Sequence, residues 1–248
     1  MVSTTEQGHD CNVTNFDLLI INCNSFGTAF NPSKETLKIE AIQALSENAK
    51  TNMTNVRNLA VAYKNAVSAR VAAFKPFDKL ITRVSNALKA SDTTVEIDNM
   101  VRTIVRKIQG RRATPKKTEE QKKSAAEAGK EIVEISTSQM SYDSRIENFN
   151  KLIILLASVP MYMPNEEELK ITALTDTYND LKSKNMAVVS AEITLNNARI
   201  ARNTVMYQDN IGLVDIATDI KTYIKSLFGT QSPQYKLVSG IRFTKYNI

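Results

Sequence analysis

The sequence contains few of the residues on which most catalytic and metal sites depend. It has a single histidine, His9, and it lacks Cys-x-x-Cys pairs and glycine-rich phosphate-binding loops. One histidine excludes Ser-His-Asp triads, Glu-x-x-His di-iron sites in helical bundles and nearly all zinc sites. Three glutamates follow one another at 166–168, but acidic residues are ordinary in the first turn of a helix. We therefore expect a protein that is not an enzyme and that binds no cofactor and no metal.

A disulfide framework, a long hydrophobic run and a secretory signal are missing as well. Two cysteines, Cys11 and Cys23, are too few for a disulfide scaffold in a chain of 248 residues, and we expect buried or half-buried thiols. The apolar runs at 18–21 and 152–163 are shorter than the roughly 20 residues that span a bilayer. The polar first ten residues do not resemble a secretory signal. We expect a soluble chain that is cytoplasmic by default, with secretion or surface display by a non-classical route as the alternative.

Glycine, proline and tryptophan are also scarce, with 7, 6 and 0 residues. This composition favours a helical protein over a turn-rich sandwich or barrel. Apolar residues recur at steps of three and four from Ile42 to Ala73 and again from Leu174 to Val205, which predicts two helices about 60 Å long. Helices of this length must bury their apolar sides against other helices. We predict an all-α, elongated helical bundle whose two very long helices lie antiparallel or side by side.

The two long stretches are related in sequence. PSKETLKIEAI begins at Pro32 and PNEEELKITAL begins at Pro164, and 12 of the 39 positions from 32 to 70 are identical to those 132 residues later. NFDLLII at 15–21 recurs as NFNKLII at 148–154, and an amphipathic helix expected over 77–90 recurs over 213–228. Chance similarity between amphipathic helices is the alternative, but ordered matches at three places disfavour it. We predict an internal tandem duplication with a pseudo-two-fold axis.

This duplication divides the chain into four parts. We expect residues 1–13 to be disordered, 14–110 to form the first helical repeat, and 139–248 to form the second repeat, packed with the first as one bundle. Between them, 111–138 is expected to be a basic linker that continues into a polar helix, and that helix would run on through 141–157. The long helices should begin at a cap, Ser33 or Asn31 in one repeat and Asn165 in the other. A short extended tail is expected at the C-terminus.

Two arginines occupy matching positions on the long helices. Arg70 and Arg202 each end an Asn-Ala-x-x-Ala-Arg segment, which begins at Asn65 in one repeat and at Asn197 in the other. A guanidinium group beside an apolar stripe needs partners, and its planar fork suits carboxylates and phosphates. Pseudo-symmetric packing would bring the four side chains together as an anion or acidic-partner site. The alternative is that each arginine lays its stem on the core and keeps its head in water.

The net charge of +6 comes from one segment. Residues 102–123 contain nine lysines and arginines and two glutamates, so this segment alone carries +7. Without interleaved aromatic residues it lacks the stacking groups of a nucleic-acid site, and a solvated linker is the simpler interpretation. Attraction to nucleic acid, lipid headgroups or an acidic partner is the alternative. The candidate electrostatic patch comprises Arg106, Lys107, Arg111, Arg112, Lys116, Lys117, Lys122 and Lys123.

These features favour a non-enzymatic structural or scaffold protein that acts through protein-protein contacts. Its partner would be another protein or a second copy of the chain, because a pseudo-symmetric rod presents related surfaces at both ends. The leading alternative is a membrane-active helical bundle that contacts a membrane surface without spanning it, with LIILLASVPMYM at 152–163 as its apolar tongue. A weaker alternative is an accessory nucleic-acid binder that uses the basic linker.

Overall fold

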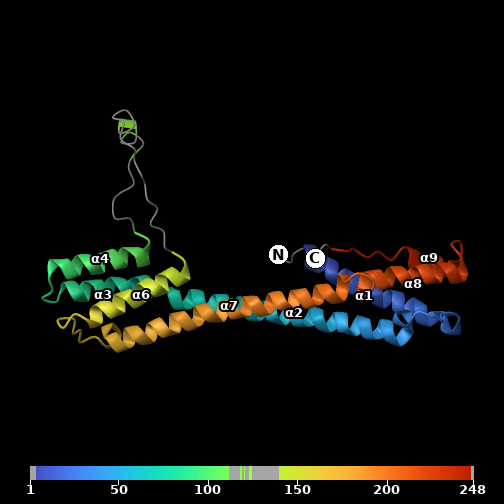
Figure 1. The fold of residues 1–248 in the computed structure, drawn as a ribbon, viewed down its shortest axis with the longest axis horizontal. Helices are drawn as coiled ribbons and strands as arrows, with labels where there is room; N and C mark the ends of the chain where they lie inside the picture. The colour runs from blue at the N-terminus through green and yellow to red at the C-terminus, as the bar shows by residue number, and fades with distance from the viewer. Residues whose placement is uncertain (1–3, 112–117, 119, 121–122, 125–139, 247–248) are drawn as a thin grey trace. The chain divides into compact units, whose positions relative to one another are not determined.

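The computed structural model describes residues 4–111, 118, 120, 123–124 and 140–246. The all-α prediction is confirmed, because the structure is 79% helical and contains no strand within these residues (Figure 1). The α-helices are α1 (Thr4–Ser25), α2 (Ile39–Phe74), α3 (Phe77–Lys89), α4 (Val95–Gln109), α6 (Tyr142–Ala157), α7 (Ile171–Tyr207), α8 (Leu213–Phe228) and α9 (Pro233–Ser239). Short 3-10 turns, η1 (Gly27–Ala29), η2 (Glu35–Leu37) and η3 (Glu167–Leu169), lie in the connections.

The chain forms two compact units. Unit 1 comprises Met1–Lys64 and Ala191–Ile248, and unit 2 comprises Asn65–Ser190. The helices α2 and α7, of 36 and 37 residues, each contribute residues to both units. This division differs from the sequence-based repeats 14–110 and 139–248, since each unit draws helices from both repeats.

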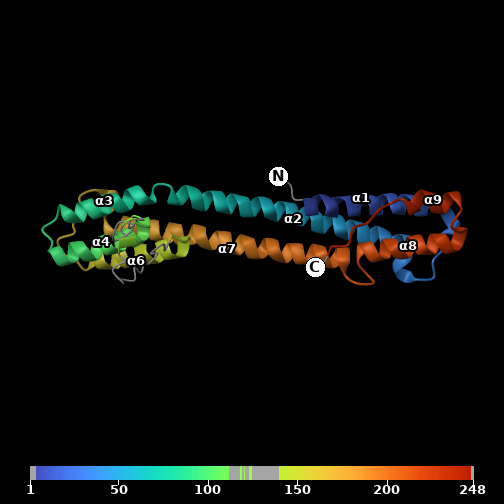
Figure 2. The same cartoon turned by 90° about the horizontal axis from the view of Figure 1, so that it is seen from above.

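Unit 1 is built on α1, α8 and α9 together with the first part of α2 and the last part of α7. Both views show α1 beside α8 (Figures 1 and 2), and both helices also contact α9. Apolar side chains from all five elements share one core cluster, whose fully buried members include Phe16, Leu19, Ile42, Met206, Ile216, Ile220 and Val238. A second, smaller cluster joins Val56 of α2 to Leu195 and Ala198 of α7.

Unit 2 is built on α3, α4 and α6 together with the end of α2 and the start of α7. Helix α2 ends at Phe74, two residues before Pro76, and α3 follows at once. Helix α4 begins at Thr94, whose side chain accepts a hydrogen bond from the Ile97 N–H, and ends at Gly110, which has a φ of 65°. The core cluster of this unit includes Phe77, Ile81, Leu88, Ile108, Phe149, Leu152, Leu156, Leu174 and Leu181.

The structure corrects two expectations near the N-terminus and the linker. Residues 1–13 were expected to be disordered, but α1 begins at Thr4, and His9 and Asn12 are buried. Their hydrogen-bond partners, Tyr207 and Thr244, lie about 200 residues later in the chain. The residues next to His9 and Asn12 in the sequence therefore do not indicate that these side chains are buried. The polar helix was expected to continue into 141–157, but Ser141 caps a new helix with its side-chain oxygen. Most of the expected linker and polar helix lies outside the described residues.

The long helices also begin differently from the prediction. Neither Ser33, Asn31 nor Asn165 caps them; instead η2 and η3 precede α2 and α7. Leu37 and Leu169, the last residues of these turns, are buried in the cores of units 1 and 2 and anchor each helix start. The C-terminal region is part helix and part tail, because α9 covers Pro233–Ser239 and residues 241–246 have no regular secondary structure.

Candidate functional site

Arg70 lies in unit 2 and takes part in a local polar network. Its Nη1 donates a hydrogen bond to Asn185 Oδ1 over 2.9 Å, and its guanidinium carbon lies 3.9 Å from the centre of the Tyr142 ring. Asn185 in turn donates to Asp143 Oδ1 over 2.7 Å. These contacts tie the end of α2 to α6 and α7. Both groups that contact the Arg70 guanidinium are neutral and belong to its own unit, and its buried Nε has no hydrogen-bond partner among the described residues.

Arg202 lies in unit 1, where it is only 4% exposed. Its Nε and Nη2 donate to Asn203 Oδ1 over 3.1 and 2.9 Å. Asn65 in unit 2 and Asn197 in unit 1 are both exposed. The two arginines thus belong to different units and have different partners, and a paired anion site that includes both stays a prediction.

The structure contains a buried arginine that the sequence analysis did not identify. Arg145 on α6 is 9% exposed, and its Nη2 donates to Asp78 Oδ1 over 2.6 Å. The same guanidinium lies 5.4 and 5.1 Å from the ring centres of Phe74 and Phe77. A sequence signal existed, because Arg145 precedes Phe149 and Leu152 by four and seven residues and so shares their buried helix face.

A basic groove lies between α3 and α4 in unit 2. Its volume is 300 Å³, and its lining residues are Thr82, Ser85, Asn86, Lys89, Arg102, Val105, Arg106, Gln109 and Arg111. Of the predicted electrostatic patch, Arg106 and Arg111 line this groove, whereas Lys107 and Lys123 are exposed and do not. Arg112, Lys116, Lys117 and Lys122 lie outside the described residues. Sequence analysis missed the lining residues of α3, because a linear charge count cannot reveal which residues face α4.

Gln109 fixes one end of this groove. Its Nε2 donates to the Asp78 carbonyl over 3.2 Å and to Thr82 Oγ1 over 2.9 Å, which joins the last turn of α4 to the start of α3. A neighbouring hollow of 380 Å³ shares Thr82, Gln109 and Arg111 as lining residues and adds Asp78 and Lys79. The Asp78 carboxylate is already bound by Arg145.

A larger pocket of 570 Å³ in the same unit has a different character. Most of its lining is aliphatic or aromatic, and Arg83 and Glu168 form an ion pair at its wall. Because this pair neutralises itself, Lys79 supplies the single excess charge among the described lining residues. The α3–α4 groove is therefore the more polar candidate.

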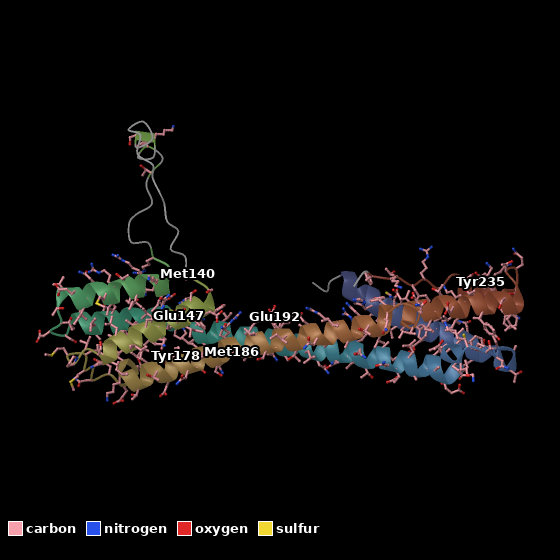
Figure 3. All side chains as sticks on the ribbon, viewed as in Figure 1. Met140, Glu147, Tyr178, Met186, Glu192 and Tyr235 are labelled. Atoms are coloured by element: carbon pink, nitrogen blue, oxygen red, sulfur yellow. The ribbon has the colours of Figure 1, made fainter. Side chains whose placement is uncertain are left out.

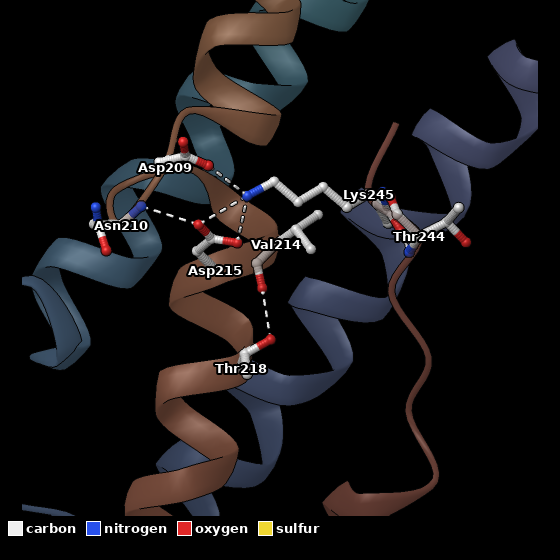
Figure 4. Close-up of polar contacts among 8 residues, drawn as sticks. Asp209, Asn210, Val214, Asp215, Thr218, Thr244 and Lys245 are labelled. Atoms are coloured by element: carbon white, nitrogen blue, oxygen red, sulfur yellow. Dashed lines mark hydrogen bonds and ion pairs between the residues drawn. The ribbon is translucent and has the colours of Figure 1, made fainter. Parts of the chain in front are cut away.

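In unit 1, the C-terminal tail is attached by polar side chains. Lys245 binds Asp209 and Asp215 over 2.8 and 3.0 Å (Figure 4). The backbone N–H of Asn210 and then the Lys245 ammonium lower the pKa of the Asp215 carboxyl. Hydrogen bonds to Asp209 and then Asp215 raise the pKa of Lys245. Asn12 of α1 pairs with both backbone groups of Thr244, over 2.7 and 2.9 Å.

The single histidine contributes to this attachment. His9 is buried, its Nδ1 lies 2.5 Å from the Tyr207 hydroxyl, and its ring packs edge-on against Tyr246. No group of three or more histidine, cysteine, aspartate or glutamate residues that could hold a metal occurs among the described residues. Within the same residues, no helix is both long and apolar enough to cross a membrane.

No family model matches this chain, and no curated protein or solved structure matches it. Its function is therefore argued from the geometry of the two units alone.

Proposed function

We propose that this protein is a non-enzymatic helical scaffold that acts through protein-protein contacts, with a second copy of the chain as its partner. The observation that carries this proposal is a pair of exposed isoleucines on α7. Ile193 and Ile200 are 56% and 61% exposed, although both lie in a long, regular helix. Removing an isoleucine side chain from water lowers the free energy, so binding of a partner that covers both residues is favoured.

The spacing of these residues suits a partner helix. Ile193 and Ile200 are seven residues apart and so lie on one face of α7, and Asn197 is exposed between them. Met186, seven residues before Ile193, is exposed as well, and Figure 3 labels it on the same helix. Apolar residues at seven-residue steps with an interspersed asparagine are typical of helix pairing that specifies register.

The proposal includes an elongated bundle that arose by internal duplication. The turns η2 and η3 begin 132 residues apart, at Glu35 and Glu167, and so do α2 and α7, at Ile39 and Ile171. Phe16 of α1 and Phe149 of α6 are fully buried at an offset of 133. Such a protein presents related surfaces twice, which favours symmetric self-association.

The test is light scattering on a size-exclusion column, over a range of protein concentrations and at low and high salt. The wild-type chain should form a defined oligomer in both salts, since apolar contacts are not screened by ions. The variant with Ile193→Glu and Ile200→Glu should be monomeric. The control carries Leu18→Glu and Ile21→Glu on α1, which are exposed to a similar degree, and should assemble normally. A wild-type chain that is monomeric at every concentration excludes self-assembly.

The second candidate function is contact with a membrane surface. It is favoured by the connection between α6 and α7, where Met161 and Met163 are 59% and 81% exposed while Tyr162 between them is buried. The Tyr162 hydroxyl donates to the Leu169 carbonyl over 2.8 Å and so holds this loop in place. Leakage of dye from liposomes that is lost when both methionines are replaced by serine would support this candidate. Intact liposomes at high protein concentration would exclude it.

A further inference from the structure

The groove between α3 and α4 concentrates positive charge in a small volume. Lys89, Arg102, Arg106 and Arg111 all line it, and no aspartate or glutamate of the described residues does. We propose that this groove binds a small ligand that carries two or more phosphate groups. This inference goes beyond the scaffold function, which concerns α7 in unit 1.

The salt bridges of the described residues leave these four cations out. No aspartate or glutamate in the described part of the chain forms an ion pair with any of them. The acidic residues of α4, Glu96 and Asp98, lie in its first turn, where Thr94 and Thr93 bind them. Arg102 and Arg106 are four residues apart on one helix, a spacing at which like charges repel. A bound anion would relieve this repulsion.

The favourable interaction of cations with a helix C-terminus explains the positions of only two of the four positive side chains. Arg106 lies in the last turn of α4 and Lys89 in the last turn of α3, where cations are favourable. Arg102 lies before the last turn, and Arg111 follows the capping residue Gly110. These two arginines therefore need a different explanation, and both face the same groove.

The groove also offers neutral donors. The Ser85 hydroxyl and the Asn86 amide line it and make no hydrogen bond within the described residues. Gln109 donates a hydrogen bond to the Thr82 hydroxyl, and this contact holds the wall of the groove in place. Val105 is a buried, apolar residue of the lining. Three guanidinium forks, an ammonium group and the hydroxyl and amide donors match the oxygens of phosphate better than those of a single carboxylate.

The number of cations favours more than one phosphate. Four positive side chains line the groove, whereas one phosphate group carries a charge of about −2 near neutral pH, so two phosphate groups balance the groove better than one. The neighbouring hollow of 380 Å³ continues past Arg111 and has room for the rest of a ligand. Among the described residues, the lining contains no aromatic side chain on which a base could stack, which favours a small ligand over a nucleic acid.

Titration calorimetry of the full-length protein with inorganic pyrophosphate tests this proposal. Pyrophosphate should bind one site saturably, and Arg102→Gln and Arg106→Gln should each weaken binding about tenfold, the loss of one charge-assisted contact. Lys107→Gln is the matched control, because it removes the same charge from the next position of α4 without touching the groove. Its affinity should stay within about twofold of the wild type. Circular dichroism of each variant should show unchanged helix content.

Two further probes identify the source of the phosphates. Sedimentation with phosphatidylcholine vesicles that contain phosphatidylinositol bisphosphate, weakened by Arg106→Gln and unaffected by Lys107→Gln, would assign them to a lipid headgroup. Binding of pyrophosphate without vesicle binding would assign them to a soluble ligand. The proposal is overturned if pyrophosphate gives no saturable heat, if Lys107→Gln weakens binding as much as Arg106→Gln, or if a single-stranded oligonucleotide binds the groove more tightly than pyrophosphate.

Discussion

At the scale of single residues, burial and pairing decide what the charged and reactive side chains do. Arg145 and Arg83 illustrate the difference, because each forms one ion pair in unit 2. The Arg145 side chain is 10% exposed and lies close to two phenylalanine rings, whereas that of Arg83 is 51% exposed. The same chemical group therefore contributes to the core in one position and to the solvated surface in the other.

Replacing Arg145 by alanine should lower the free energy of unfolding by about 1–2 kcal/mol. The loss combines a cation-π contact with the packing of the aliphatic stem, while Asp78 stays solvated at 58% exposure. Arg83→Ala, the matched control, should cost about 0.5 kcal/mol or less, as exposed pairs do. Urea unfolding followed by circular dichroism measures both values. Equal losses would show that Arg145 acts only through its ion pair.

The two cysteines should differ sharply in reactivity. Cys11 is exposed and Cys23 is fully buried, and burial raises the pKa of the Cys23 thiol to about 12. Since the thiolate is the reactive form, iodoacetamide should modify one cysteine in the native protein at about pH 8 and both after denaturation. Mass spectrometry of the digested protein identifies the modified residue. Modification of both native cysteines at similar rates would contradict the buried position of Cys23.

These cysteines do not form a disulfide with one another in this fold. Both lie in α1, twelve residues and therefore about 18 Å apart along the helix axis, far beyond the reach of a disulfide. The expectation of a buried or half-buried thiol is confirmed for Cys23 and is wrong for Cys11, which is exposed.

At the scale of secondary-structure elements, the C-terminal tail is attached to unit 1 by hydrogen bonds from side chains and not by the backbone hydrogen bonds of a helix or sheet. Residues 241–246 lie along α1 and α8, and Asn15 and Lys221 also donate to backbone carbonyls of this tail. Phe243 packs edge-on against Phe16. A segment attached in this way can be released by changing one anchor.

Asn12→Ala should release the tail from α1. The Thr244 N–H and carbonyl would both lose their partner, so the protection of the Thr244 amide against hydrogen exchange should fall about tenfold or more. Asn22→Ala is the control, because the Asn22 side chain donates only to Leu18 in its own helix. Unchanged protection in Asn12→Ala would show that the other contacts hold the tail by themselves.

Acid should weaken the same attachment. The pKa of Asp215 is lowered in the folded protein, so its stabilising contribution is complete above its ordinary value of 3.8 and is lost as the pH falls through the lower folded value. The Lys245 contact should therefore persist at pH 5 and fail only below about pH 3.8. Two-dimensional NMR of the tail amides against pH measures this transition. A transition centred above pH 5 would contradict it.

At the scale of the whole molecule, each compact unit combines helices from both halves of the sequence. Unit 1 contains α1 from the first half and α8 and α9 from the second, and unit 2 contains α3 and α4 from the first and α6 from the second. Neither half of the chain can complete a core alone. Folding therefore requires contacts between residues more than a hundred positions apart.

Co-expression of residues 1–124 and 125–248 as separate chains tests this organisation. The two fragments should co-purify as a one-to-one complex with the helix content of the intact protein, because each unit needs elements from both. Each fragment expressed alone should be aggregated or poorly folded. A fragment that is folded, monomeric and cooperative by itself would show that the halves, and not the two units, are the folding domains.

Much of the local structure could be predicted from the sequence. The apolar spacing at 42–73 and 174–205 falls within α2 and α7, and the helix expected over 213–228 has the bounds of α8. The candidate sites were harder to predict. Arg70 was correctly placed beside an apolar stripe, but its partners Tyr142 and Asn185 lie more than 70 residues away.

The sequence by itself determined the helical class, since hydrophobic spacing and the scarcity of glycine and proline act over a few neighbouring residues. Only the tertiary structure decided that His9 and Asn12 are buried, that Arg145 lies beside Phe74 and Phe77, and that α3 and α4 form a basic groove. The physical reason is distance along the chain. A side chain's burial and charge balance depend on which segments pack around it, and here those segments come from opposite halves of the sequence.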